Sequence, residues 1–219
     1  MNGGWPALLG ILAAALLAAL VGDGLASGAE RDLDRKVQAF LEGHRDRWRD
    51  MNIPEADGRI LHDLIVRNGY RRALEIGTST GRSAIWIAWA LSKTDGRLIT
   101  VEIDEDRFKE AKAHFEEAGL SSYIDARRAD AHELVPALEG PFDFVFCDAD
   151  KGWYTNYLTA VLPKLDVGGC FAAHNVPGDG HGGGTAEFYR YVKTLPYLET
   201  TLAPGSPAGM SISCRRAGK

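Results

Sequence analysis

The stretch "RRALEIGTSTGRSAIWIAWAL", Arg71–Leu91, decides the fold of this chain. It opens with a short apolar run of strand length, which stops at Gly77. A turn rich in hydroxyl side chains follows, and the strongly apolar run after it has the length of a buried helix. A strand, a glycine turn and a helix in this order form the first half of a βαβ unit.

The rest of the chain repeats the alternation of strand and helix. Further strands are expected at 96–104, 123–130, 142–148, 168–174, 197–203 and 209–216. Helices are expected at 30–50, 54–69, 83–91, 105–119, 131–140, 154–165 and 185–195. The pattern predicts an α/β protein with a doubly wound, mainly parallel sheet and helices on both faces. The last two strands have no helix between them, which indicates an antiparallel hairpin at one edge.

Composition narrows the class of protein. The chain has 219 residues, is 45% hydrophobic and carries a formal charge of -5. It contains no basic block, so charge gives no indication of nucleic-acid binding. The three cysteines lie far apart in apolar runs and form no CxxC pair. We therefore expect Cys147, Cys170 and Cys214 to be buried, reduced thiols.

Residues 1–28 differ from the domain expected over 29–219. The segment 6–22 is uncharged and apolar, and as a helix it would be about 25 Å long. Basic residues follow it at Arg31, Arg35 and Lys36, which favours a membrane anchor with the domain on the cytoplasmic face. The small residues of "GLASGAE", 24–30, also suit a signal peptide that is cleaved during export. Both interpretations stay open.

The glycine turn and the strand after it suit a nucleotide. Gly77 lets the backbone approach a ligand, while Ser79 and Ser83 add hydroxyl donors near a helix N-terminus. The spacing is not the G-x-G-x-x-G of dinucleotide folds. Glu102 ends the next strand, 25 residues beyond Gly77, where a carboxylate can bind ribose hydroxyls. Asp130 ends the third strand, beside the expected position of a base.

Polar residues also end the fourth and fifth strands. "DFVFCDADKGWY", 143–154, places Asp148 at a strand end and Lys151 three residues later. "GGCFAAHNV", 168–176, ends its apolar run at His174 and Asn175. The carboxyl ends of parallel strands meet at one edge of a sheet, so these side chains are expected near the nucleotide. They indicate either a metal site with its own base or two strands that simply stop at polar residues.

Successive motifs from about Met51 to Arg215 resemble class I S-adenosylmethionine-dependent O-methyltransferases, in particular the caffeoyl-CoA and catechol O-methyltransferases. The motifs are "MNIPEADGRILHDLI", "LEIGTSTGRSAIWIA", "VEIDEDRFKEAK", "DADKGWY" and "HNV". The resemblance implies a seven-stranded Rossmann-like sheet in the order 3-2-1-4-5-7-6, with strand 7 antiparallel. It also implies cofactor-binding roles for Met51, Glu75, Gly77, Ser79, Ser83, Glu102, Asp130, Ala131 and Asp148.

The resemblance further implies Lys151 as the base that takes the acceptor's proton, and a metal held by Asp148, His174 and Asn175. His174 departs from the family pattern, which has an aspartate there. Three interpretations of His174 stay open: a ligand for a divalent metal (Mn, Zn or Mg), a general base in a metal-free site, or a loop histidine without a chemical role.

The sequence therefore predicts a methyltransferase that acts on a hydroxyl of a small catechol-like or phenolic acceptor. One alternative is a protein that binds an adenosyl ligand without metal chemistry. Another is a metal-independent methyltransferase for a different small acceptor. The resemblance also makes a homodimer plausible.

Overall fold

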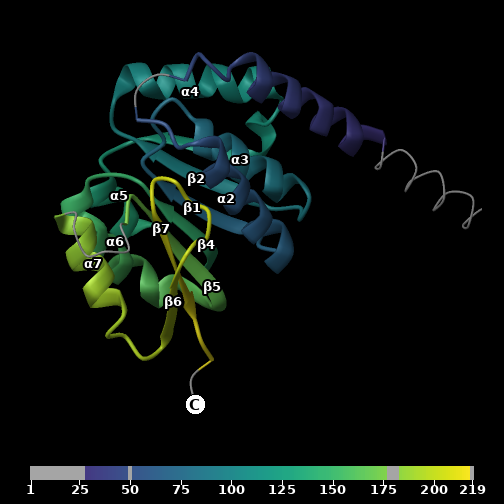
Figure 1. Ribbon diagram of the computed structural model, residues 1–219. Helices are drawn as coiled ribbons and strands as arrows, with labels where there is room; N and C mark the ends of the chain where they lie inside the picture. The colour runs from purple at the N-terminus through teal and green to yellow at the C-terminus, as the bar shows by residue number, and fades with distance from the viewer. Residues whose placement is uncertain (1–27, 49–50, 177–182, 218–219) are drawn as a thin grey trace, which may run out of the picture.

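The computed structural model of the chain describes residues 28–48, 51–176 and 183–217 (Figure 1). These residues form a seven-stranded sheet in the order β3-β2-β1-β4-β5-β7-β6. The strands are β1 Arg72–Ile76, β2 Arg97–Glu102, β3 Ile124–Arg128, β4 Phe142–Cys147, β5 Leu165–His174, β6 Leu198–Leu202 and β7 Met210–Arg215. β1 to β5 are parallel, and β7 is antiparallel to both β5 and β6. The predicted fold class, strand order and edge hairpin are confirmed.

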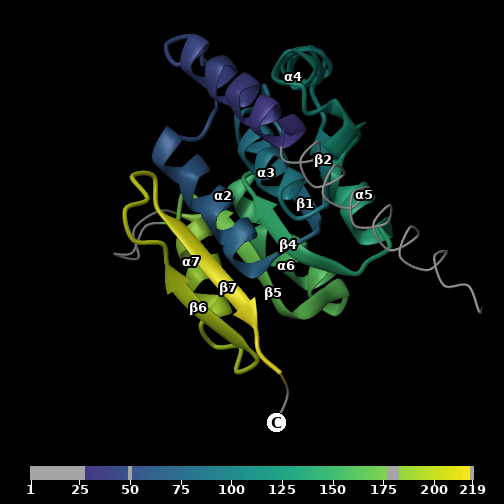
Figure 2. The ribbon, with the colours of Figure 1, turned by 90° about the vertical axis from the view of Figure 1, so that its right-hand side faces the viewer.

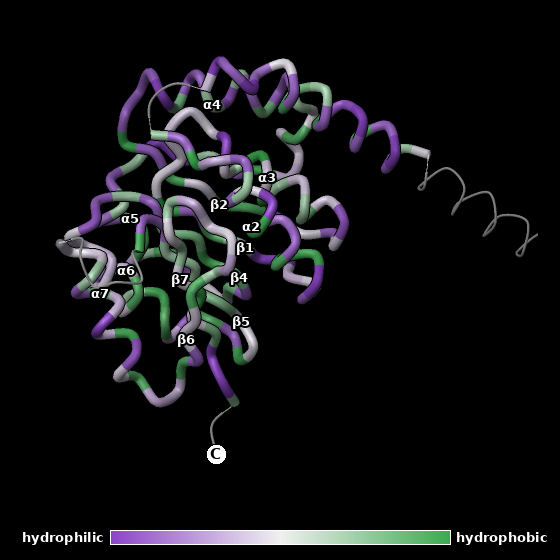
Figure 3. The backbone as a smooth tube through the Cα atoms, viewed as in Figure 1, coloured by the Kyte–Doolittle hydropathy of each residue, from purple (hydrophilic) through white to green (hydrophobic). Residues whose placement is uncertain are grey.

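Helices cover both faces of the sheet (Figure 2). They are a helix at 28–43, α2 Glu55–Asn68, α3 Arg82–Ser92, α4 Glu105–Ala118, α5 Ala131–Ala137, α6 Tyr154–Val161 and α7 Gly184–Val192. One core packs α2, α3 and α4 against one face, and a second packs α5, α6 and α7 against the other. Alternate residues of β4 divide between the two cores, so this strand is buried on both sides. Figure 3 colours this arrangement by hydropathy: the central strands are apolar, and the helices around them are more polar.

Short turns bring the strand ends close together. Gly77, directly after β1, has φ +95°, and a Cβ there would lie 2.8 Å from the carbonyl oxygen of Asp148. A side chain at this position would therefore clash with the chain that leaves β4. Gly81 precedes α3 with φ +97°, and a Cβ there would meet Phe115 at 2.7 Å. These close contacts fix the backbone of the turn after β1, which borders the carboxyl ends of the strands.

The cysteine prediction is wrong for two of the three residues. Cys170 and Cys214 form a disulfide, while Cys147 is a buried free thiol as expected. The antiparallel register of β5 and β7 places Cys170 directly opposite Cys214. Because the two cysteines are 44 residues apart in sequence, their spacing does not reveal this register. The bond ties the edge hairpin to the parallel part of the sheet.

The predicted location at a membrane is contradicted, and with it the alternative of export. In the part of the chain that the structure describes, no helix has the length and apolar character of a membrane span. The most apolar labelled helix, α3, has 11 residues and is buried against the sheet, far short of the ~20 residues that a span needs. The segment 6–22 itself lies outside the described residues.

Candidate active site

A pocket of about 750 Å³ opens at the carboxyl ends of the parallel strands. Its lining includes nearly all of the predicted site residues: Met51, Gly77, Ser79, Ser83, Glu102, Asp130, Ala131, Asp148, Lys151, His174 and Asn175. These residues come from six separate stretches of the chain. The topology therefore gathers the cofactor-type residues and the strand-end Asp, Lys and His in one cavity.

Glu102 is fixed at the end of β2 by backbone donors. Its Oε2 accepts the N–H of Ser79 at 2.7 Å, and its Oε1 accepts the N–H of Asp104 at 2.9 Å. Each oxygen keeps a lone pair that can accept another hydrogen bond. Ser79 has φ +49°, and its Oγ is buried without a hydrogen-bond partner. The first turn thus presents one unused donor beside a held carboxylate.

Glu75 lies inside the protein and is not one of the pocket-lining residues. Burial raises the pKa of its carboxyl to about 8, with hydrogen bonds from Ser83 and Thr100 acting in the opposite direction. The Thr100 Oγ1 donates to Glu75 Oε2 at 2.5 Å. Glu75 therefore carries a proton at neutral pH and supports the turn from below.

Asp130 caps α5 and lies next to a group of aromatic side chains at the rim of the pocket. The Asp130 side chain accepts the N–H of His132 at 2.8 Å. The His132 ring stacks on Trp153, with centroids 3.7 Å apart. Asp150 joins this group, since its two oxygens contact His132 Nε2 at 3.0 Å and the Tyr157 hydroxyl at 2.7 Å. His132, Asp150 and Tyr157 line the pocket, and the tilted Tyr157 ring continues the stacked pair of His132 and Trp153.

Lys151 is held by two partners. Its Nζ donates to Asp148 Oδ1 at 2.5 Å and to the Tyr154 hydroxyl at 3.0 Å. Tyr154 is fully buried, and its hydroxyl donates to the carbonyl oxygen of His174 at 3.2 Å. Burial raises the pKa of Tyr154, so it stays a neutral hydroxyl. The ammonium group is thereby directed to one corner of the pocket.

His174 lies between two carboxylates. Its Nε2 hydrogen-bonds to Asp57 Oδ2 at 2.8 Å, and its Nδ1 lies 3.1 Å from Asp148 Oδ2. The second contact is an ion pair that is not aligned as a hydrogen bond. Burial lowers the pKa of the ring, but the close contact and charge of Asp148 and the hydrogen bond and charge of Asp57 outweigh it and raise the pKa to about 9. His174 is therefore an imidazolium at neutral pH.

Sequence reasoning missed Asp57, the second carboxylate of this arrangement. Asp57 lies in the first turn of α2 and is completely buried. It stands 117 residues before His174 in the chain. The available signal was a carboxylate next to Gly58 in a helix that the sequence assigned correctly. Nothing in that pattern indicated which strand end the helix would face.

A family model described as "O-methyltransferase" matches residues 31–186. The chain belongs to this family. A catechol O-methyltransferase from Niastella koreensis is 37% identical over 134 residues, which cover 59% of this chain and 60% of the relative. Caffeoyl-CoA O-methyltransferase 1 from Zea mays is 33% identical over 134 residues, covering 58% of this chain and 52% of the relative. The chain thus spans between half and two thirds of these curated relatives.

Solved structures of O-methyltransferases are similar over most of the chain. The O-methyltransferase from Bacillus cereus, in complex with SAH, has a TM-score of 0.71 and 26% identity, covering 83% of this chain and 91% of that one. TomG from Streptomyces achromogenes, involved in tomaymycin synthesis and in complex with SAM, has a TM-score of 0.70 and 26% identity, covering 83% and 90%. The resemblance of this family member to S-adenosylmethionine-dependent enzymes is therefore shown by sequence and by fold.

The metal site implied by the family resemblance does not fit the residues present. Asp148, its only predicted acidic ligand, already pairs through one oxygen with Lys151 and through the other with His174. The nitrogen of His174 that faces Asp148 belongs to an imidazolium and so offers no lone pair. Within the described residues, no group of three or more His, Cys, Asp or Glu side chains is arranged to hold a metal ion. Asp148 is thus arranged to pair with the two cationic side chains Lys151 and His174, and not to bind a divalent metal.

Proposed function

We propose that this protein is an S-adenosylmethionine-dependent O-methyltransferase that methylates a hydroxyl of a small phenolic or catechol-like acceptor. The proposal rests mainly on one observation: the Glu102 turn and Lys151 line the same pocket. A methyl donor held by the turn would present its sulfonium to an acceptor beside Lys151. Membership of the family supports the same activity.

The cofactor would lie along the strand ends. The turn from Gly77 to Ser83 and the N-terminus of α3 suit the methionine carboxylate, because free N–H groups and the helix dipole favour an anion. Glu102 suits the ribose hydroxyls. Asp130 and Ala131, where α5 begins, line the far part of the pocket and suit the adenine. Glu75 would act indirectly, by supporting the turn.

The reaction is an in-line displacement. The acceptor oxygen forms a bond to the methyl carbon while the bond from that carbon to the sulfonium sulfur breaks. Lys151 first releases its own proton to solvent, and the acceptor's proton then passes to the amine. Holding the reactants in line contributes up to ~7–11 kcal/mol to catalysis. Tyr154 and Asp148 keep the Lys151 Nζ in place for this transfer.

The alternative of a metal-independent methyltransferase is favoured because both oxygens of Asp148 already pair with cations, Lys151 and His174. A protein that only binds an adenosyl ligand would need no lysine held at the acceptor corner of the pocket. Residues 29–219 are proposed as the methyltransferase domain. A homodimer remains a prediction from the family resemblance.

The proposed function is tested with the full chain, S-adenosylmethionine carrying a labelled methyl group, and a panel of catechols and single-hydroxyl phenols. Calorimetry with S-adenosylhomocysteine measures cofactor binding separately. We expect cofactor binding and labelled product. Cofactor binding without transfer to any acceptor would favour the adenosyl-binding alternative, and absence of both would reject the proposal.

A further inference from the structure

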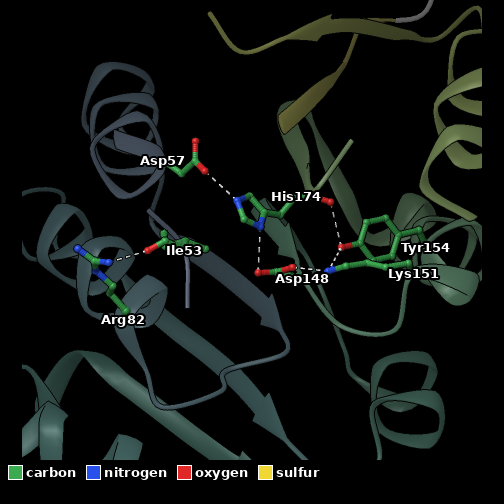
Figure 4. Close-up of polar contacts among 7 residues, drawn as sticks. All are labelled: Ile53, Asp57, Arg82, Asp148, Lys151, Tyr154 and His174. Atoms are coloured by element: carbon green, nitrogen blue, oxygen red, sulfur yellow. Dashed lines mark hydrogen bonds and ion pairs between the residues drawn. The ribbon is translucent and has the colours of Figure 1, made fainter. Parts of the chain in front are cut away.

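Four charged side chains form a row at the acceptor end of the pocket (Figure 4). Asp57, His174, Asp148 and Lys151 follow one another through contacts of 2.8, 3.1 and 2.5 Å. In the resting site Lys151 is the ammonium that pairs with Asp148. Negative and positive groups then alternate along the row, so the four charges sum to zero. A divalent cation added here would meet no excess of negative charge.

The inner two groups of the row, Asp57 and His174, are buried, so water cannot stabilise their charges. Asp57 has no exposed surface and His174 is 3% exposed, so each charge depends on its neighbour. A buried carboxylate left unpaired is strongly destabilising, which favours the charged form of the imidazole. Asp57 Oδ1 has no hydrogen-bond partner, so the Nε2–H of His174 is its main compensation among the described residues.

The structure also fixes where Asp57 lies. Gly58 follows it, and a Cβ on Gly58 would lie 2.3 Å from the Trp86 ring, so α2 packs directly on α3. Arg82, the first residue of α3, donates from its guanidinium to the carbonyl oxygen of Ile53 at 2.9 Å, just before α2 begins (Figure 4). The carboxylate is thus held in place by α3, the same helix that follows the glycine turn.

We propose that Asp57 fixes His174 as a permanent cation beside Asp148, where it takes the place of a divalent metal in methyl transfer. This inference rests on the proposed function and deepens it. Asp57 is a positioning residue, because it acts through His174. The imidazolium neutralises Asp148 and stabilises negative charge that develops on the acceptor oxygen.

The step balances without a metal. Lys151 first releases its proton to solvent. The acceptor O–H then gives its proton to the Lys151 amine, the new O–CH₃ bond forms, and the sulfonium becomes the neutral thioether of S-adenosylhomocysteine. His174 keeps its protons throughout and serves as a fixed charge. Since no ion has to be chelated, a second adjacent hydroxyl is not required. Single-hydroxyl phenols are therefore acceptors alongside vicinal diols.

The first test measures metal binding directly. Mn²⁺, Zn²⁺ and Mg²⁺ are titrated by calorimetry into the full chain saturated with S-adenosylhomocysteine, with Asp148→Ala as the control. In parallel, ¹⁵N spectra of labelled histidine report the protons on the His174 ring. We expect no metal binding that depends on Asp148, and both ring nitrogens protonated at neutral pH. Binding lost in Asp148→Ala, or a His174 nitrogen that loses its proton to a metal, would overturn the proposal.

The second test removes the charge of Asp57 while keeping its shape. In Asp57→Asn, we expect kcat to fall by at least about tenfold, the scale seen for carboxylates that partner functional histidines, with unchanged affinity for S-adenosylhomocysteine. The ¹⁵N spectrum should show that the imidazole has lost one proton. Asp63→Asn, on the exposed face of the same helix, should behave as the unaltered protein. A fully protonated ring and an unchanged kcat in Asp57→Asn would contradict the proposal.

The third test restores the aspartate that the family pattern has at position 174. The double variant Asp57→Asn/His174→Asp removes the fixed cation and offers oxygen ligands from Asp148, position 174 and Asn175, which suit Mg²⁺ and Mn²⁺. We expect this variant to bind Mn²⁺ in calorimetry, and the binding to disappear when Asp148→Ala is added. If the folded double variant, checked by circular dichroism, binds no ion, His174 is not what excludes the metal.

The outcomes separate the two proposals. If no acceptor is methylated, the proposed function fails, yet calorimetry and the ¹⁵N spectra still decide whether a metal or an imidazolium stands beside Asp148. If transfer occurs but stops with EDTA and returns with a divalent metal, the function stands and this inference fails. Transfer that is unaffected by EDTA, with phenol and catechol rates within about tenfold, supports both, because loss of a chelated ion would cost several kcal/mol.

Discussion

At the scale of single residues, cofactor binding and proton transfer are assigned to Glu102 and Lys151, which line one pocket. Glu102 is held by two backbone N–H groups, and its free lone pairs suit the ribose. In Glu102→Gln, we expect the affinity for S-adenosylhomocysteine to fall about 10- to 100-fold, since hydrogen bonds to a charged group contribute ~1.5–3 kcal/mol. Calorimetry measures this, and exposed Glu110→Gln is the control. Equal affinity in Glu102→Gln and the unaltered protein would remove Glu102 from the cofactor site.

Lys151 is assigned to take the proton of the acceptor, so its loss should affect the rate of transfer and leave cofactor binding intact. Lys151→Met keeps much of the side-chain length and removes the amine. We expect kcat to fall by about 10²- to 10⁴-fold, the range for loss of a general base, with unchanged affinity for the cofactor. Exposed Lys109→Met, on α4, is the matched control. A loss of cofactor affinity that accounts for the whole effect would assign Lys151 to binding instead of proton transfer.

At the scale of elements, the decisive feature is the close approach of the β1 turn to the chain leaving β4. In Gly77→Ala, the new Cβ meets the Asp148 carbonyl oxygen and the φ of +95° is strained. We expect a loss of unfolding free energy of at least ~1–3 kcal/mol and weaker cofactor binding. Gly152→Ala, where nothing lies within 4 Å of the new Cβ, is the control. Denaturant unfolding measures the difference, and equal stability of the two variants would contradict this account.

The elements also show what the sequence can predict. The strands and helices followed from apolar runs and glycine turns, because the periodicity of each element is local. The partners of His174 and Cys170 were not predictable in this way. Asp57 reaches His174 only because α2 packs on α3, and Cys170 meets Cys214 only through the register of two strands. Both contacts depend on the packing of elements that are distant in sequence.

At the scale of the whole molecule, two buried groups make stability depend on pH. The pKa of His174 is raised from 6.5 to about 9 and that of Glu75 from 4.5 to about 8. The folded state therefore binds more protons than the unfolded state, from about pH 4.5 to 8 at Glu75 and from about pH 6.5 to 9 at His174. The free energy of unfolding should fall as pH rises through these windows, by up to about 1.4 kcal/mol per pH unit per group.

Urea unfolding at a series of pH values measures this slope. His174→Gln should flatten the curve between about pH 6.5 and 9, and Glu75→Gln should flatten it between about pH 4.5 and 8. Stability that is constant or rises between pH 7 and 9 in the unaltered protein would show that the two groups do not hold their protons as described.

The measurement that tests the central claim most directly is methyl transfer in a single turnover. The full chain is loaded with S-adenosylmethionine carrying a labelled methyl group and mixed with catechol, beside Lys151→Met loaded to the same extent. We predict labelled product from the unaltered protein and a rate lower by about 10²-fold or more from the variant. Equal rates from both proteins, or no product from a fully loaded protein across the acceptor panel, would contradict the account.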